Sequence, residues 1–463
     1  MNTVKNIFVL ICISIVTFPV LGQKQTPPPG GKPKDFVLPE KKVSQLKNGL
    51  KSTMVQYGSI PKVTVNLIIK TGNVNEGPNE VWLADLTGEL MKEGTTTMDF
   101  KTISRKVAAM GGEINIGVSS DQTSISGSVL SEFAADLIKI MADVVINPAL
   151  PTSEIDRLKS DLKRQLSVQK SRPQSQAIES FNSLIYKDHP YGRTFPTQAM
   201  LDSYTIDMAK NFYEKNFGAK RAVIYVVGKF DEAATQKAIE ESFNNWKEGP
   251  APEYPPVTPT KTDEIAMIDR ADAPQTTIIL GLPTITPQHS DYVALQVTNS
   301  LLGGSFGSRI TSNIRENKGY TYSPFSTIQN HKNTSVWYEQ ADVTSEHTGA
   351  ALQEIAKEVK TLQAEAPPKT ELEGIQNYMA GVFVLQNSTP AGIIGQLNFI
   401  DNHGLSDSYL TDRVKNIYAV TPEKVSAIAK EHFKYEDMTL VLVGDKKLLQ
   451  KQIKSYEEAK KVR

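Results

Sequence analysis

The sequence has almost no cysteine. The one cysteine among 463 residues, Cys12, lies inside an apolar run at residues 7–21. A mature chain that begins after this run has no thiol, which excludes disulfides and cysteine metal sites. An exported protein without disulfides fits a bacterial periplasm better than it fits a disulfide-bonded extracellular domain.

An excess of charge of either sign is also missing. Lys and Arg together number 51, as do Asp and Glu, so the net charge is zero. The sequence shows no basic stripe that would neutralise phosphates. Nucleic-acid binding is therefore excluded as a function class.

Histidine is scarce, and no two histidines stand at the i, i+4 spacing that places a pair of metal ligands on one helix face. We expect all of them to be surface or structural residues. The six are His189, His289, His331, His347, His403 and His432.

The N-terminus carries an export signal. The apolar run at residues 7–21 is short for a membrane span, and Val20 and Gly22 are small residues at the −3 and −1 positions of a cleavage site. We expect a signal peptide at residues 1–22, export to a bacterial periplasm and no stable membrane insertion after cleavage. The alternative is an uncleaved anchor. Residues 23–35 are rich in Pro and Gly and predict a tether.

Residues of the first half recur at a fixed distance in the second half. Pairs that differ by 216 or 217 positions are Leu86 and Leu302, Gly88 and Gly304, Pro151 and Pro368, Pro173 and Pro390, Thr205 and Thr421, Phe217 and Phe433, and Gly228 and Gly444. The period is too long for a solenoid and indicates a duplicated domain of about 210 residues. We place the copies at residues 36–246 and 263–463, on either side of a proline-rich linker at residues 247–262.

Both copies show the same order of elements. In the first copy, β-branched and apolar runs predict strands at residues 63–69, 113–118, 123–129 and 221–227, with amphipathic helices between and after them. The predicted fold class is α+β, with a mostly antiparallel sheet in each copy that is covered by helices on one side.

The stretch at residues 301–322 carries the strongest chemical signal. A helix is expected to begin after the glycine pair at residues 303–304 and to end at Gly319, which puts Arg315 in its last turn. Tyr322 is expected at the start of a strand. A guanidinium and a phenol held this way both donate to a carbonyl oxygen or an oxyanion. The alternative is that Arg315 is only a surface cation at a helix end and that Tyr322 lies in the core.

The second copy resembles the pitrilysin, insulinase and mitochondrial-processing-peptidase family of inverted zinc peptidases. The match reads L-G-G-x-F-x-S-R-I at residues 302–310 and I-R-E-x-K-G-Y-x-Y-S at residues 314–323. The resemblance extends over about residues 40–450. It implies two similar domains that form one half of a clamshell around a chamber.

The first domain of that family carries H-x-x-E-H, with two zinc histidines and a glutamate base, and a glutamate ligand further along. The resemblance places these positions at Asp85, Gly88, Glu89 and Gln165, so every ligand and the base are replaced. Asp85 and Glu89 share a helix face and are expected to be solvated carboxylates, with a hard cation as the alternative. Gly88 is expected to be a relaxed helix position, at a cost on the order of 1 kcal/mol relative to alanine.

Some members of this family work in pairs, in which one subunit has the zinc site and the other keeps only the Arg and Tyr. The resemblance implies that this chain is the non-catalytic, substrate-binding subunit of a periplasmic heterodimeric zinc metallopeptidase, with Arg315 and Tyr322 as its contribution. Zinc is expected only in the related H-x-x-E-H partner, and the substrates are expected to be unfolded or short peptides. Two alternatives are open: a homodimeric pseudoenzyme that binds or encloses peptides or scaffolds an envelope complex, and a self-sufficient metalloendopeptidase.

Overall fold

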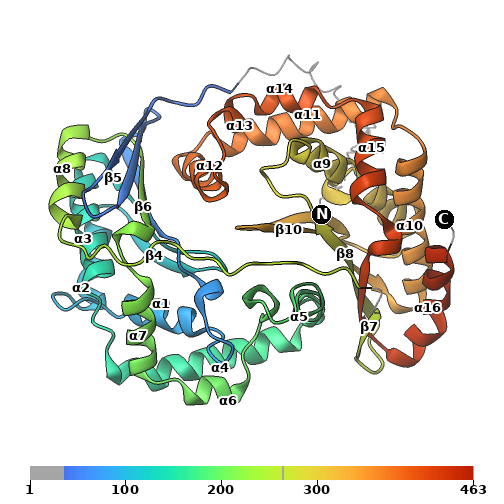
Figure 1. Ribbon diagram of the computed structural model, residues 1–463, viewed down its shortest axis with the longest axis horizontal. Helices are drawn as coiled ribbons and strands as arrows, with labels where there is room; N and C mark the ends of the chain where they lie inside the picture. The colour runs from blue at the N-terminus through green and yellow to red at the C-terminus, as the bar shows by residue number, and fades with distance from the viewer. Residues whose placement is uncertain (1–35, 263–264, 462–463) are drawn as a thin grey trace, which may run out of the picture. The chain divides into compact units, whose positions relative to one another are not determined.

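Two β-sheets form the framework of the computed structural model, which describes residues 36–262 and 265–461 (Figure 1). The predicted signal peptide at residues 1–22 and nearly all of the predicted tether at residues 23–35 lie outside the described residues. Both sheets belong to one compact unit that runs from Lys34 to Arg463. Within the described residues, none of the helices combines the length and the apolar character that a membrane crossing requires.

The first sheet has the strand order β1-β2-β6-β3-β5-β4, and only β2 and β6 are parallel neighbours. Its strands are β1 (Lys41–Gln45), β2 (Lys51–Gln56), β3 (Lys62–Ile69), β4 (Glu113–Val118), β5 (Thr123–Leu130) and β6 (Ala222–Gly228).

The second sheet has the order β7-β11-β8-β10-β9, and only β7 and β11 are parallel neighbours. Its strands are β7 (Ile265–Asp269), β8 (Gln275–Thr284), β9 (Phe325–His331), β10 (Thr334–Thr344) and β11 (Thr439–Gly444). Apart from β1, the second sheet repeats the first strand for strand. The predicted fold class, a mostly antiparallel sheet in each copy, is confirmed.

Each half contributes a set of helices, most of which cover one face of their own sheet. Those of the first half are α1 (Leu83–Lys92), α2 (Phe100–Ala109), α3 (Ala134–Ile146), α4 (Ile155–Ser171), α5 (Pro173–Tyr186), α6 (Gln198–Ser203), α7 (Ile206–Asn216) and α8 (Glu232–Phe243). Those of the second half are α9 (Tyr292–Asn299), α10 (Thr348–Ala364), α11 (Lys369–Gln386), α12 (Pro390–His403), α13 (Ser408–Thr411), α14 (Arg413–Tyr418), α15 (Pro422–His432) and α16 (Lys446–Lys461).

The recurring residues of the two halves occupy equivalent structural positions. Thr205 and Thr421 are the N-cap residues of α7 and α15, and each hydroxyl accepts a hydrogen bond from the backbone N–H three residues later. Gly228 and Gly444 end β6 and β11. The sequence repeat therefore records the caps and strand ends of a duplicated fold.

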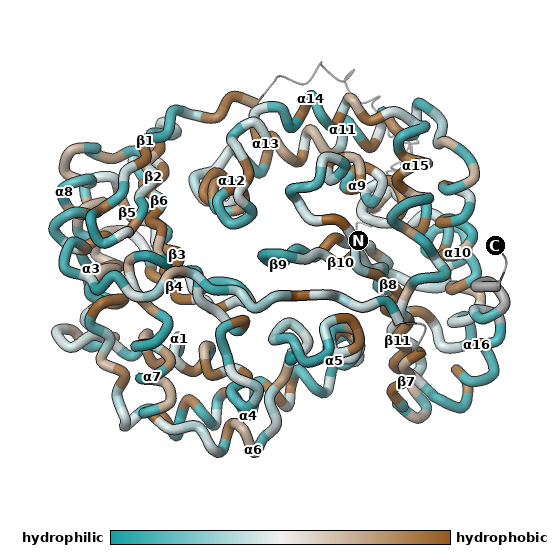
Figure 2. The backbone as a smooth tube through the Cα atoms, in the orientation of Figure 1, coloured by the Kyte–Doolittle hydropathy of each residue, from teal (hydrophilic) through white to brown (hydrophobic). Residues whose placement is uncertain are grey.

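The second face of each sheet is covered by a helix of the other half, which the prediction of helices on one side did not include. On β6, Ile224 and Val226 point to the helices of the first half, whereas Val223, Tyr225 and Val227 face α12. Figure 2 shows the apolar character of this strand. A strand buried on both faces reads as a continuous apolar run.

The exchange of helices is reciprocal. On α5, Phe181 and Ile185 pack against Ile279 of β8 and Val441 of β11 in the second sheet. Both α5 and α12 begin with a proline of the sequence repeat, Pro173 and Pro390, so the equivalent helices exchange places. Each half thus completes the core of the other.

Removal of a side chain on α5 should destabilise the opposite half. We predict that Phe181→Ala lowers the free energy of unfolding by about 3–5 kcal/mol, because a fully buried aromatic ring is lost from a packed core. Urea titration measures the loss, and amide hydrogen exchange locates it. Exchange should accelerate in β8 and β11; an effect confined to residues 36–246 would contradict the reciprocal packing. Phe100→Ala, at an exposed phenylalanine, is the control.

Candidate functional site

The stretch at residues 301–322 forms two wide helical turns that pack on the second sheet. Residues Ser300–Gly304 and Thr311–Asn317 are π-helical, a local widening that is frequent at functional sites. The helix ends as predicted at Gly319, which has a φ of +66°. The backbone N–H of Gly319 donates to the carbonyl of Arg315, and that of Tyr320 donates to the carbonyl of Ile314.

The glycine pair permits a close approach to the sheet. A methyl group at Gly303 would lie 2.6 Å from Glu339 Oε2 and from Ser326 Oγ, and one at Gly304 would lie 2.5 Å from Asn299 Nδ2. Glu339 is fully buried, and neither of its carboxyl oxygens has a hydrogen-bond partner within the described residues. Burial raises the pKa of Glu339 well above its usual range. Gly303 thus seats the segment on β9 and β10, and Gly304 lies against the end of α9.

Arg315 and Tyr322 lie against each other at the surface. The guanidinium carbon of Arg315 is 5.1 Å from the centre of the Tyr322 ring and 4.3 Å from the centre of the Phe306 ring. Arg315 Nε also lies 3.1 Å from Glu316 Oε1. Because the Tyr322 side chain is 78 % exposed, the alternative that placed it in the core is wrong.

The strand predicted at Tyr322 is also wrong. Only Thr321 bridges β10, opposite Val343, and β9 begins at Phe325. The hydroxyl of Thr321 donates to the carbonyl of Asp342 at 2.8 Å. Tyr322 therefore lies in the loop between Thr321, which is bonded to β10, and the start of β9, and it is not part of the sheet.

The positions that correspond to H-x-x-E-H lie on α1 and are poorly suited to a metal. Asp85 is partly buried and accepts a hydrogen bond from Asn73 Nδ2 at 2.7 Å, so the expectation of a solvated carboxylate is wrong. Glu89 is half-exposed and pairs with Lys92 at 2.6 Å. Gly88 is not relaxed, because a methyl group there would lie 2.8 Å from Val118 of β4.

A buried acid, Glu76, lies beside Asp85 and carries no sequence signal. Glu76 accepts hydrogen bonds from the backbone N–H groups of Trp82 and Ala84, and from Asn73 Nδ2. Burial raises the pKa of Glu76 to about 8, and the charge of Asp85 acts in the same direction. No motif marks this residue, because its contacts to the first turn of α1 arise only on folding.

Gln165 lies exposed on α4, across a groove from α1. The groove has a volume of about 780 Å³ and is lined by Glu89 and Gln165 together with Arg157, among others. Arg157 pairs with Glu154 at 2.7 Å and also with Glu93. The charges of this groove are thus satisfied by one another.

Zinc does not fit these four positions. Catalytic zinc requires three convergent protein ligands, usually including imidazoles. Here a carboxylate bonded to an amide, a glycine, an ion-paired glutamate and an exposed amide stand in their places.

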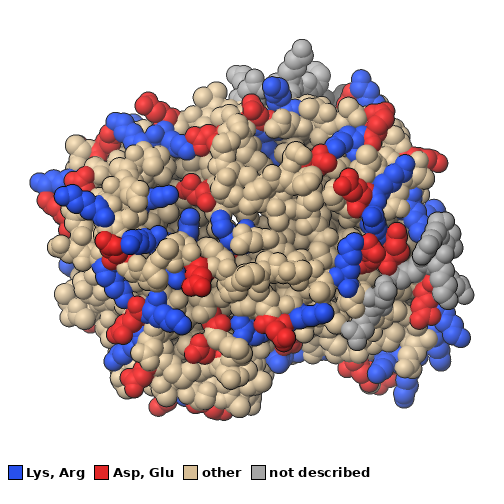
Figure 3. All heavy atoms as spheres, in the orientation of Figure 1, with Lys and Arg blue, Asp and Glu red and all other residues tan. Residues whose placement is uncertain are grey.

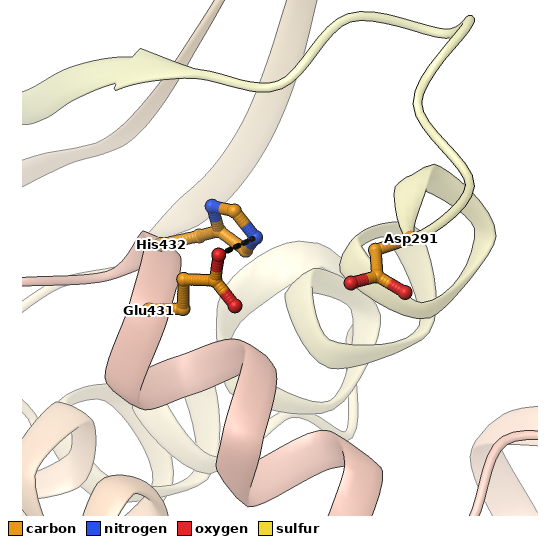
Figure 4. A group of neighbouring side chains, drawn as sticks. All are labelled: Asp291, Glu431 and His432. Carbon is orange, nitrogen blue, oxygen red and sulfur yellow. Dashed lines mark ion pairs between the residues drawn. The ribbon is translucent and has the colours of Figure 1, made fainter.

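One other group of potential metal ligands occurs among the described residues. Asp291, Glu431 and His432 offer one ligand atom each within 4.8 Å of one another (Figure 4). Lys424 already pairs with Asp291 at 2.7 Å. The group lies on α15 and at the start of α9, in the half that does not contain the H-x-x-E-H positions.

A buried polar cluster joins the two halves. Asp121, in the turn between β4 and β5, accepts hydrogen bonds from the Tyr191 hydroxyl at 2.5 Å and from the backbone N–H of Lys332 at 3.0 Å. The ring of His331 stacks on that of Tyr191, with centres 3.9 Å apart. Burial lowers the pKa of His331 to about 4, so its imidazole is neutral at pH 7.

Comparison with known proteins places this arrangement in a family. The description "Insulinase (Peptidase family M16)" matches residues 54–197, and the description "Peptidase M16 inactive domain" matches residues 203–379. The chain belongs to peptidase family M16. This is the family that the L-G-G and R-E-x-K-G-Y motifs resemble.

Relatives of this M16 chain include proteins described as proteases and as non-peptidases. An uncharacterized zinc protease of Rickettsia bellii is 26% identical and covers 72% of this chain and 80% of that protein. The non-peptidase homolog YmxG of Helicobacter pylori is 21% identical and covers 84% of this chain and 90% of that protein.

Solved structures share the fold. A crystal structure of a peptidase M16 inactive domain from Pseudomonas fluorescens has a TM-score of 0.81 and 24% identity, and covers 88% of this chain and 98% of that one. The crystal structure of a protease from Helicobacter pylori has a TM-score of 0.82 and 20% identity, and covers 88% of this chain and 100% of that one. With its zinc positions replaced, this chain is an inactive M16 member, consistent with a non-catalytic peptidase-like subunit.

Metal analysis of the purified chain tests the assignment of the four α1 and α4 positions. After incubation with Zn²⁺ and dialysis, we expect less than about 0.1 zinc per chain, because the required ligand set is missing. If zinc is retained in stoichiometric amount and is lost in Asp85→Ala, the site has been misjudged. His432→Gln serves as the control for binding elsewhere.

The buried histidine of the inter-half cluster should make stability depend on pH. Because the pKa of His331 is about 4 in the folded chain and 6.5 in the reference state, the unfolded chain binds the extra proton between these values. The stabilisation is complete above pH 6.5 and is lost as the pH falls towards 4. Urea titrations give the free energy of unfolding at pH 7 and at pH 4. The fall in this free energy from pH 7 to pH 4 should be about 3 kcal/mol smaller in His331→Gln than in the natural chain. An equal difference in both chains, or the same change in the exposed-histidine control His347→Gln, would contradict this assignment.

Proposed function

We propose that this M16 chain is the non-catalytic, substrate-binding subunit of a heterodimeric zinc metallopeptidase that acts on peptides. The observation that carries the proposal is the contact of Arg315 with an exposed Tyr322 in a chain whose zinc positions are replaced. A chain that is only a scaffold has no need to hold a guanidinium and a phenol together at its surface.

The chemistry of the pair fits a supporting role in peptide hydrolysis. A guanidinium and a phenol both donate hydrogen bonds, and neither supplies a nucleophile at neutral pH. Aimed at the carbonyl of the bond to be cut, they would stabilise the negative charge that develops on its oxygen. The nucleophilic water and its metal must then come from another chain.

The partner is expected to be a related M16 subunit with H-x-x-E-H, and zinc belongs only to that subunit. The signal peptide expected at residues 1–22 favours the bacterial periplasm as the location of the pair. Substrates are expected to be unfolded or short peptides, which can add as an extended strand to a sheet edge of the catalytic subunit.

The alternative, a homodimeric pseudoenzyme, predicts peptide binding without cleavage. Such a chain would bind peptides without hydrolysis, and Arg315 and Tyr322 would have no effect on any rate. The mixed surface charge in Figure 3 offers no single-signed docking face on the side that it shows. The exposed aromatic rings beside Arg315 favour the composite site.

Substitution of the pair tests the proposal. In an equimolar mixture of this chain with the H-x-x-E-H relative from the same genome, we expect Arg315→Ala and Tyr322→Phe each to lower kcat for a peptide by about 10²-fold, as for the loss of one oxyanion donor. Size exclusion should show that the variants still pair. Leu385→Ala, which removes a side chain that is also largely exposed, is the control. Unchanged kinetics in both site variants would refute the assigned role.

A further inference from the structure

We infer that Phe306 is a positioning residue, whose ring holds the guanidinium of Arg315 beside Tyr322. The consequence for catalysis rests on the proposed function, whereas the positioning is a property of this chain alone. Neither the motif chemistry nor the family match assigns a role to this ring.

The contacts of Arg315 single out Phe306. Its ring centre is 4.3 Å from the guanidinium carbon, closer than that of Tyr322 at 5.1 Å. The Phe306 side chain is 70 % exposed, so its burial contributes little to the core. The Arg315 side chain is only 24 % exposed, because the two rings cover much of it. The ring of Phe306 thus shields a cation at the surface.

The backbone that carries Phe306 is tied to the helix that carries Arg315. The backbone N–H of Ser308 donates to the carbonyl of Ser305 at 3.1 Å and closes a turn around Phe306. The hydroxyl of Ser308 then donates to Thr311 Oγ1 at 2.9 Å, at the start of the wide helical turn. On the other side, Gly303 seats the segment against Glu339 and Ser326. The ring is therefore presented by a turn that is fixed at both ends.

A carboxylate also holds Arg315, but only at its Nε atom. Glu316 follows Arg315 directly, and its Oε1 lies 3.1 Å from Arg315 Nε. An arginine side chain has many rotamers, and one contact at Nε leaves the orientation of the guanidinium plane open. A cation–π contact holds the flat guanidinium along the ring face and leaves its edge donors available to an oxygen. Without the ring, Arg315 is expected to keep the Glu316 contact, to lose the surface that orients its guanidinium and to spend more time in water.

The first readout uses this chain alone. The Nε–Hε resonance of Arg315, assigned by its disappearance in Arg315→Lys, is shifted by the ring currents of its aromatic neighbours. We expect Phe306→Ala and Phe306→Leu to move this resonance towards that of a free arginine, and Phe306→Tyr to retain its position. A resonance that does not move in Phe306→Ala overturns the positioning role, whether or not any partner is active.

The second readout uses the mixture with the H-x-x-E-H relative. At exposed sites, a cation–π contact corresponds to a change of about two- to fivefold, which we expect as a fall in kcat for Phe306→Ala and Phe306→Leu. KM should change less, and Phe306→Tyr should restore kcat. In an Arg315→Ala background, Phe306→Ala should have no further effect, since the ring acts through the guanidinium. Leu385→Ala, whose side chain is also 70 % exposed, is the matched control.

The Arg315 resonance and the kcat of the mixture together distinguish failure of the positioning role from failure of the proposed function. A moved resonance with an active mixture and an unchanged kcat overturns the catalytic consequence of the positioning. A natural mixture without any activity overturns the proposed function, and the resonance then decides the positioning by itself.

Discussion

The reciprocal exchange of α5 and α12 is the packing constraint on which the rest of the structure depends. Each sheet has two apolar faces, and its own half covers only one of them. The exchange also reaches the Arg and Tyr segment. Gln174 of α5 donates to the carboxylate of Asp342 at 2.7 Å, and the carbonyl of Asp342 accepts from Thr321, the neighbour of Tyr322. The first half therefore helps to fix a site that lies in the second half.

The packing of α1 shows which of the four zinc positions the fold itself constrains. The core requires the buried face of α1, with Leu86 and Leu90, and requires a small residue at Gly88 where α1 meets Val118. It does not require a histidine at positions 85 or 89. Asp85 and Glu89 are instead held by Asn73 and Lys92. Packing of α1 thus constrains position 88, which corresponds to the glutamate base, and leaves positions 85 and 89 to polar contacts.

Much of this could be predicted from the sequence. The strands, the duplication and the helix end at Gly319 are local or periodic features, and the residue pattern of the sequence predicts them. The exchange of α5 and α12 could not be predicted, because an apolar run such as β6 indicates burial on both faces but not which helix provides it. The stack of Phe306 on Arg315 and the acid at Glu76 depend on contacts between segments whose distance the sequence does not state. The predictions of a solvated Asp85 and of a strand at Tyr322 were wrong for the same reason. Asp85 is bonded to Asn73, and the bridge to β10 is formed by Thr321 and not by Tyr322.

The most direct test of the central claim, that this M16 chain completes the active site of another, is a titration of peptide cleavage. A fixed amount of the zinc-containing H-x-x-E-H relative receives increasing amounts of this chain, and the initial rate is followed. We expect no cleavage by this chain alone and a rate that rises to a plateau at an equimolar ratio. A rate that is independent of this chain, or cleavage by this chain without the relative, would contradict it.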